Sequence, residues 1–153
     1  MTIRTSNIPA CAIAFILVFS SHASLAADAI GQIKTETGSA SIERGGAARA
    51  ALIGDHVFQS DVVLTGADGT VGITFADNSM MSLGPNSRLS LDEFRFNTTT
   101  HEGVFNASLP KGTLAVRSGQ IVQQTPEAMH VQTPAALLGV RGTHFVVRAG
   151  GGT

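Results

Sequence analysis

The sequence has one cysteine, Cys11, and neither tryptophan nor tyrosine in its 153 residues. Cys11 lies within the first 26 residues, so a chain processed after residue 26 has no thiol. That excludes disulfide bonds, thiolate zinc sites and cysteine nucleophiles in the processed protein. Sugar-binding surfaces usually use aromatic rings that also form hydrogen bonds, whereas the aromatic rings here are all phenylalanine. The composition thus argues against several classes of enzyme and binding protein.

Charge of either sign is also scarce. Ten Lys and Arg and eleven Asp and Glu give a formal net charge of −1, and no basic cluster is present to neutralise phosphates. We therefore expect no nucleic-acid partner. We also expect no metal, because the histidines beyond residue 26 do not have metal-ligand spacing. These are His56, His101, His130 and His144. No nucleophile motif such as Gly-x-Ser-x-Gly occurs, so we expect no catalytic residue, no cofactor and no enzyme activity.

The first 26 residues have the pattern of a signal peptide. Arg4 supplies a positive charge, an apolar run covers residues 10–19, and Ser24-Leu25-Ala26 fits the small-x-small rule for cleavage. The apolar run is about half as long as the ~20 residues that a membrane-spanning helix needs. We predict export through a signal peptide over residues 1–26, with no membrane span after processing. About 127 residues would remain, the size of one domain.

Beyond residue 26 the sequence predicts short β-strands separated by turns. Val71, Ile73 and Phe75 alternate with polar or small residues, which is the period-two pattern of a half-buried strand. No segment sustains a helical pattern. The fold class is therefore all-β, with a single compact domain over residues 27–147. The glycine-rich end, residues 148–153, is predicted to be a disordered tail.

Three of the predicted turns are evenly spaced. Asp68, Asp77 and Asn86 lie nine residues apart, each beside small or turn-forming residues. Both a tight β-meander and a coiled, solenoid-like sheet or sandwich would produce this spacing.

Several local expectations follow from composition. Residues 47–52 are too few for an independent helix, so we expect an extended connection that carries Leu52 to the core. Leu109-Pro110 is expected to form a turn, and Gln120 to Gln124 a strand. Asp92 to Glu102 is the most polar stretch and is predicted to be an exposed hairpin or loop.

An ordered set of motifs runs through the predicted β domain. In chain order these are Gly54-Asp55, Asp61-Val62-Val63-Leu64-Thr65, Asp68-Gly69-Thr70, Phe75-Ala76-Asp77-Asn78-Ser79, Leu83-Gly84-Pro85-Asn86-Ser87, Leu109-Pro110-Lys111-Gly112, Val131-Gln132-Thr133-Pro134 and Gly139-Val140-Arg141-Gly142-Thr143-His144-Phe145. From about Gly31 to Val147 this set resembles the periplasmic domain of the FecR (ferric citrate regulator) family. The resemblance implies an all-β fold and a location in the periplasm.

Two positions depart from the family pattern. Ser60 and Asn78 stand where the family commonly has glycine. Asparagine tolerates positive φ better than other non-glycine residues, so the turn at Asn78 is expected to survive.

A larger departure concerns the architecture that the resemblance implies. The regulators of this family carry a cytoplasmic segment that binds a sigma factor and a membrane helix before this domain. Here a cleavable signal peptide is expected in their place. We therefore expect the family's fold and compartment without its anti-sigma activity.

The Thr133-Pro134 and Arg141-Gly142-Thr143 segments are the most distinctive. Pro134 forces the residue before it into an extended conformation, which indicates a strand edge or bend. Gly139 and Gly142 flank Arg141, and we expect its guanidinium to point inward and to form a bidentate pair with a carboxylate. The candidate carboxylates are those of Asp61 and Asp77. We favour a structural role for this network over the alternative, a ligand-binding role for Arg141.

Three functions are consistent with the sequence. The leading hypothesis is a non-catalytic module of the cell envelope that binds a protein or another envelope component, most plausibly through residues 92–102. The first alternative is an accessory of iron-siderophore transmembrane signalling that works with a separate sigma regulator. The second is a metal-dependent binder or hydrolase that uses the aspartate-rich turns.

Overall fold

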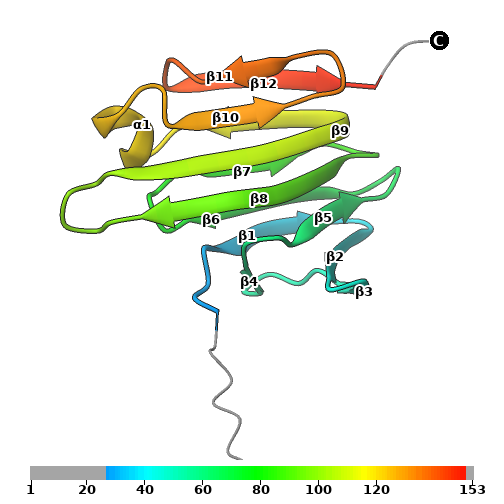
Figure 1. The fold of residues 1–153 in the computed structure, drawn as a ribbon. Helices are drawn as coiled ribbons and strands as arrows, with labels where there is room; N and C mark the ends of the chain where they lie inside the picture. The colour runs from blue at the N-terminus through cyan, green and yellow to red at the C-terminus, as the bar shows by residue number, and fades with distance from the viewer. Residues whose placement is uncertain (1–26, 151–153) are drawn as a thin grey trace, which may run out of the picture.

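The structure is a computed structural model that describes residues 27–150. The predicted signal peptide and residues 151–153 of the predicted tail lie outside the described residues. The described part contains a 12-stranded sheet and one helix, α1 (Gln120–Gln124), so the all-β prediction is confirmed (Figure 1).

The sheet folds over into two layers. In pairing order, the first layer contains β3 (Ala47–Ala50), β2 (Ala40–Arg44), β5 (Val62–Thr65), β8 (Arg88–Phe96), the first half of β9 (Gly103–Arg117), β10 (Met129–Gln132) and β11 (Leu137–Gly139). The second contains β4 (His56–Val57), β1 (Gly31–Thr37), β6 (Thr70–Phe75), β7 (Met80–Leu83), the second half of β9 and β12 (His144–Ala149). All strand pairs are antiparallel except that of β9 with β10.

Strand β9 joins the two layers. Its residues 103–108 pair with β8 and β10, and its residues 112–117 pair with β7 and β12. Gly112 lies where the strand passes from one layer to the other, at φ +102°, a conformation that side-chain-bearing residues rarely adopt. The turn predicted at Leu109-Pro110 is therefore wrong, because the strand bends there without ending.

The core lies between the layers. Phe75 from the second layer meets two rings of the first, with centroids 4.6 Å from Phe105 and 5.9 Å from Phe94. Val71, Ile73 and Phe75 are all at most 2% exposed, so the alternation predicted for this strand is confirmed. Burial of such side chains contributes about 1.5–3 kcal/mol each.

The turns that carry the chain between layers lie side by side at one end of the sandwich. Thr65 Oγ1 donates to Gly84 O (2.7 Å) and accepts from Ser87 N (2.9 Å). Ser87 Oγ in turn accepts from Thr113 N (2.9 Å) and lies 3.2 Å from Thr113 O. We call this chain of contacts through Thr65, Ser87 and Thr113 the corner ladder. It connects the turns after β5, after β7 and in the middle of β9.

The nine-residue spacing has its origin in these turns. Asp68 and Asn86 belong to turns at the end of the sandwich where the corner ladder lies. Asp77 belongs to the β6–β7 hairpin at the opposite end of the sandwich. Asn86 N donates to Gly66 O (2.9 Å), and hydrogen bonds from Ser39 lower the pKa of Asp68 below its ordinary value. Each interval is thus one strand and one turn of a sandwich with stacked, solenoid-like corners.

Positive φ is found where the family commonly has glycine. Ser60 has φ +70° and Asn78 has φ +64°. The turn at Asn78 therefore forms as predicted.

Three local expectations are corrected. Leu52 is 59% exposed, because the Asp55 carboxylate accepts from Leu52 N (2.9 Å) and holds the chain in a surface turn, and Ala51 fills the core instead. Gln120–Gln124 is a helix and not a strand, closed by Thr125 N donating to Ile121 O (2.8 Å). Strand β12 continues through Ala149, which is buried, two residues beyond the predicted end of the domain.

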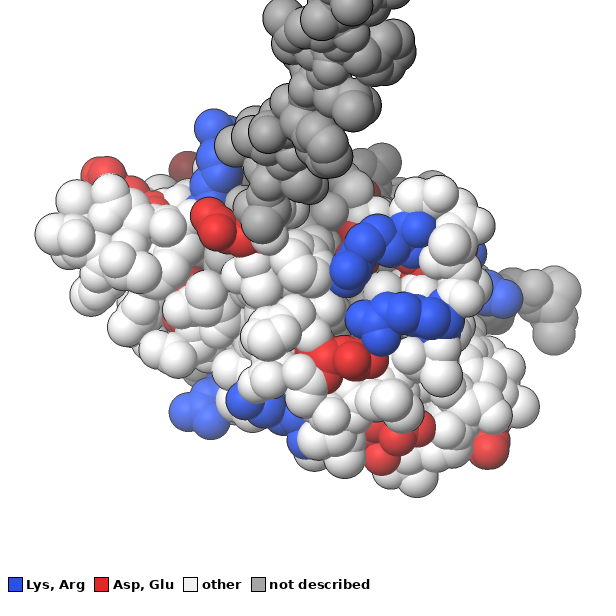
Figure 2. Space-filling model, turned by 90° about the horizontal axis from the view of Figure 1, so that it is seen from below, with Lys and Arg blue, Asp and Glu red and all other residues white. Residues whose placement is uncertain are grey.

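The surface around β3 and β4 carries both acidic and basic side chains. Figure 2 shows acidic and basic side chains in small separate groups among uncharged ones on this face. Arg44, Arg49 and Arg88 each form an ion pair with a carboxylate in this region. No extended basic patch is visible on this face that would attract a nucleic acid.

The corner at Gly112 predicts the effect of a substitution. A Cβ added there would lie 2.1 Å from Ser87 Oγ, so Gly112→Ala combines backbone strain with a collision inside the corner ladder. We expect it to lower the free energy of unfolding by about 3 kcal/mol or more. Gly54→Ala is the matched control, because Gly54 has φ +94° and nothing within 4 Å of the added Cβ, and should cost about 1 kcal/mol. Urea unfolding followed by circular dichroism measures both, and equal losses would contradict the role of the ladder.

Candidate functional site

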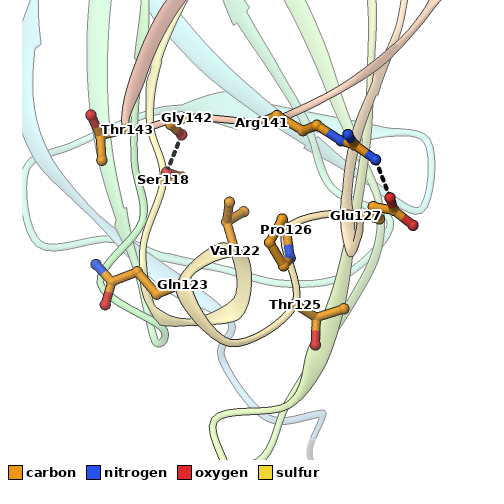
Figure 3. A pocket seen from close by; sticks show the side chains of 9 residues that line it. All are labelled: Ser118, Val122, Gln123, Thr125, Pro126, Glu127, Arg141, Gly142 and Thr143. Carbon is orange, nitrogen blue, oxygen red and sulfur yellow. Dashed lines mark hydrogen bonds and ion pairs between the residues drawn. The ribbon is translucent and has the colours of Figure 1, made fainter.

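A hollow of about 540 Å³ lies beside α1, at the end of the sandwich opposite the corner ladder (Figure 3). Val122 and Pro126 provide an apolar middle, and polar side chains surround it. We call this hollow the α1 pocket. Its full lining is Ser118, Val122, Gln123, Thr125, Pro126, Glu127, Arg141, Gly142 and Thr143.

The β6–β7 turn fixes the start of α1. Asp77 accepts from the Ser79 amide (3.0 Å) and from the Ser79 hydroxyl (2.6 Å), and both residues are fully buried. Ser79 Oγ also accepts from Gly119 N (2.9 Å), and Asp77 O accepts from Gln120 N (2.8 Å). A Cβ on Gly119 would lie 2.2 Å from Asp77 O, so only glycine allows this close approach. Asp77 therefore has a structural role beside the pocket.

The segment between β11 and β12 forms the opposite wall of the α1 pocket. Ser118 Oγ donates to Gly142 O (2.6 Å), and Ser118 N donates to Thr143 O (3.1 Å). Gly142 has φ +130°, which glycine adopts without strain. The Arg141-Gly142-Thr143 motif and α1 thus enclose one hollow, although they are about twenty residues apart in the sequence.

Arg141 does not have the partner that the sequence predicted. Its guanidinium pairs with the carboxylate of Glu127 at the pocket rim, and the side chains are 74% and 71% exposed (Figure 3). The expected pairing with Asp61 or Asp77 is wrong, and so is the expected inward direction. Asp77 is already bonded within its own turn, and Asp61 has another arginine.

Asp61 forms the bidentate pair that was expected of Arg141. Its two carboxylate oxygens lie 2.7 Å from Nε and 2.7 Å from Nη2 of Arg44, and Oδ2 also accepts from Phe58 N (2.9 Å). Asp61 is fully buried, and the Arg44 guanidinium lies 4.2 Å from the centre of the Phe58 ring. The hydrogen bond to Asp61 raises the pKa of Arg44. This pair ties the start of β5 to β2 and does not line the α1 pocket.

Thr133 and Pro134 lie at the other end of the sandwich, in the turn between β10 and β11. Thr133 N donates to Ala136 O (2.8 Å), and Thr133 Oγ1 accepts from Ala136 N (3.1 Å). The two residues therefore close a tight turn, as the bend predicted at Pro134 requires, and they are not part of the pocket.

The polar stretch from Asp92 to Glu102 ends β8 and turns into β9. Asn97 Oδ1 accepts from Thr99 N (2.9 Å) and Thr100 N (3.1 Å), which organises the β8–β9 turn. The predicted hairpin is confirmed, and Figure 1 places this turn at the same end of the sandwich as α1. The α1 pocket and the β8–β9 turn together form the candidate interaction face.

The described residues were also compared with the requirements of a metal site and of a membrane-spanning helix. Within residues 27–150 no group of three or more His, Asp and Glu side chains is placed to hold a metal ion. In the same part of the chain, no helix has the length and apolar character needed to cross a membrane.

No pattern in the sequence pointed to Val122, Pro126 or Glu127 as site residues. Their role in the α1 pocket depends on the short helix, and the composition of that segment predicted a strand. The Asp77–Gly119 contact that starts the helix joins residues 42 positions apart and has no local pattern.

Comparison with known proteins gives a family. The family model described as FecR protein matches residues 61–153, more than half of the chain. A solved structure described as a cell surface anchoring domain is 35% identical, covers 40% of this chain and 82% of its own, and has a TM-score of 0.38. The comparison with curated proteins gives no match.

The two arginine–carboxylate pairs are expected to differ strongly in a double-mutant cycle. For Arg141 and Glu127, truncation to Ala should show a coupling below about 1 kcal/mol, because both groups are solvated. For Arg44 and Asp61 the coupling should be about 2 kcal/mol or more, since Asp61 is buried and bidentate. Urea unfolding of the single and double variants gives both values. A larger coupling for the Arg141 pair would contradict the structure and restore a stabilising role for Arg141.

Proposed function

This chain belongs to the FecR family, and from that premise we propose that it is a non-catalytic module of the cell envelope that binds a protein partner through the α1 pocket and the β8–β9 turn. The family is a regulatory and signalling one whose members are associated with the envelope. We further propose that residues 1–26 export the chain and that it works in the periplasm.

The observation that carries this proposal is the position of the family's distinctive motif. The segment is held to Ser118 through the carbonyls of Gly142 and Thr143, but Arg141, Gly142 and Thr143 are all exposed and no side chain of the three enters the core. They do form a wall of the α1 pocket. A motif that lies on a pocket rim and not in the core is more simply explained by recognition than by folding.

The chemistry of the pocket fits a protein side chain. Val122 and Pro126 offer an apolar surface, and Arg141 and Glu127 offer opposite charges at the rim. An apolar side chain of a partner would enter the hollow, while polar groups of its neighbours exchange with the exposed Arg141–Glu127 pair. Such a site needs no cofactor and no catalytic group.

A role in iron-siderophore signalling remains the second candidate, because the family is a signalling one. Calorimetry of the purified protein with a ferric siderophore and with calcium separates this class from the first. Heat with the siderophore favours direct ligand sensing, and heat with calcium favours metal binding at the aspartate turns. Neither ligand should give heat if the function is protein recognition alone.

Site-directed photo-crosslinking tests the proposed surface. A photo-reactive benzoylphenylalanine is placed at Gln123 in the α1 pocket, at Thr98 in the β8–β9 turn, and at Ala48 on β3 as an exposed control. In cells of the native host we expect the first two positions to give the same crosslinked species and Ala48 to give none. Arg141→Glu should reduce the yield at Gln123 several-fold, because it reverses the charge at the rim. Equal crosslinking from all three positions would contradict the proposal.

A further inference from the structure

Strand β12 is an edge strand with unpaired backbone groups. Within residues 27–150 it pairs only with β9, from His144↔Arg117 to Ala149↔Gly112. Ser118 N donates to Thr143 O just before this ladder, and hydrogen-bonded and non-hydrogen-bonded pairs alternate along antiparallel strands. The amides and carbonyls of Phe145, Val147 and Ala149 therefore face β9. Those of His144, Val146 and Arg148 face away from the sheet.

This edge lacks most of the usual protection against strand addition. Exposed edges are commonly short, bulged, or carry proline or charged side chains, lysine above all. Strand β12 has six residues, no proline, no lysine and a continuous register with β9, and Arg148 is its one arginine. Its central residue Val146 is 70% exposed. At the opposite edge of the same layer, β4 has only two residues.

The outer face beside this edge carries two arginines. Arg117 lines a hollow of about 390 Å³ on this face together with Met80, Ala115 and Val146, and Arg148 lies on the outer face of β12 two residues beyond Val146. Strand β7, the second half of β9 and strand β12 contain no Asp or Glu. In the described part of the chain neither Arg117 nor Arg148 has a carboxylate within salt-bridge distance.

These charges argue against pairing of the β12 edge with the β12 edge of a second copy of this chain. Antiparallel pairing of two β12 strands about Val146 would gather Arg148 and Arg117 of both copies on one outer face. Like charges brought together across paired strands destabilise the pairing. An added strand with carboxylates on its outward face would instead place them beside these arginines, which is a favourable pairing.

The inner side of the same edge is apolar. Phe145 and Leu138 are only partly buried, although both pack against the core. They lie where the two layers end, at β12 and β11. An added strand with apolar side chains at alternate positions would cover Phe145 and continue the core.

We propose that the β12 edge binds an extended segment of another protein as an added antiparallel strand, with acidic side chains outward and apolar side chains toward the core. This mode is β-strand addition, in which main-chain hydrogen bonds give affinity and alternate side chains give specificity. It concerns a surface other than the α1 pocket, so each proposal can fail alone.

The probe is a blocked eight-residue peptide in which glutamate and valine alternate, added to the purified ¹⁵N-labelled protein. In the antiparallel arrangement the glutamate amides face β12 and the valine amides face solvent. Methylation of the glutamate amides should therefore weaken binding at least about tenfold, whereas methylation of the valine amides should leave it nearly unchanged. A peptide with lysine in place of glutamate should also bind at least about tenfold more weakly. Bound unmethylated peptide should slow hydrogen exchange at the His144, Val146 and Arg148 amides.

A protein variant gives an independent check. Val146→Pro removes an amide that faces the added strand and donates nothing to β9, and should weaken binding at least about tenfold. Val146→Thr keeps the amide and the branched shape and should bind like the parent. The amide spectrum shows whether Val146→Pro is folded. If this variant is not folded, the methylated peptides test the proposed strand addition on the parent protein.

Several results would overturn the inference. They are equal binding of the two methylated peptides, slowed exchange at strands other than β12, absence of binding at millimolar peptide, and a concentration-dependent dimer that protects the same amides without peptide. Crosslinking from Gln123 and Thr98 is unaffected by any of these outcomes, and binding of the peptide is unaffected by Arg141→Glu.

Discussion

Hydrogen bonds from the side chains of Thr65 and Ser87 to the backbone of neighbouring turns position the chain reversals on which the two layers depend. Thr65, Ser87 and Thr113 come from three different crossings of the sandwich, and their contacts are 2.7–3.2 Å long along the corner ladder. Thr65 and Ser87 are 8% and 1% exposed, so a lost partner would leave a buried polar group unsatisfied. In the described residues no buried side-chain nitrogen or oxygen lacks a partner. The turns are therefore fixed relative to one another, and with them the bend of β9 at Gly112.

The opposite end of the sandwich is built differently. Asp77 and Ser79 anchor the start of α1 with short hydrogen bonds, but the rim beyond them consists of exposed groups such as Arg141 and Glu127. A rigid ladder at one end and a solvated rim at the other is a common division between scaffold and recognition surface. It explains why the most distinctive motif of the chain lies outside the core.

The elements that the sequence predicted correctly are those whose conformation depends on neighbouring residues. The alternation of Val71, Ile73 and Phe75 reflects one buried face of one strand, and the positive φ of Asn78 and Asn86 reflects tight turns. The turn at Thr133-Pro134 follows from the restriction that proline imposes. All of these follow from properties of a few adjacent residues.

Two features that the sequence did not predict, the helix α1 and the partner of Arg141, depend on distant contacts. Gln120–Gln124 is helical because Asp77 and Ser79, some forty residues earlier, bind its first turn. The partner of Arg141 was predicted from charge alone, and the buried Asp61 had already been paired with Arg44 through the pairing of β2 with β5. Tertiary pairing decided both of these cases. Leu52 was assigned to the core for its apolarity, but a local surface turn closed by Asp55 exposes it.

Native-state hydrogen exchange tests the central role of the corner ladder most directly. The amides of Ser87 and Thr113 donate to Thr65 Oγ1 and Ser87 Oγ inside the ladder. If the ladder holds the layers together, both should exchange only through global unfolding, with the same free energy as core amides such as that of Ile73. Exchange of the Ser87 and Thr113 amides through local opening, at a clearly lower free energy than Ile73, would contradict the account.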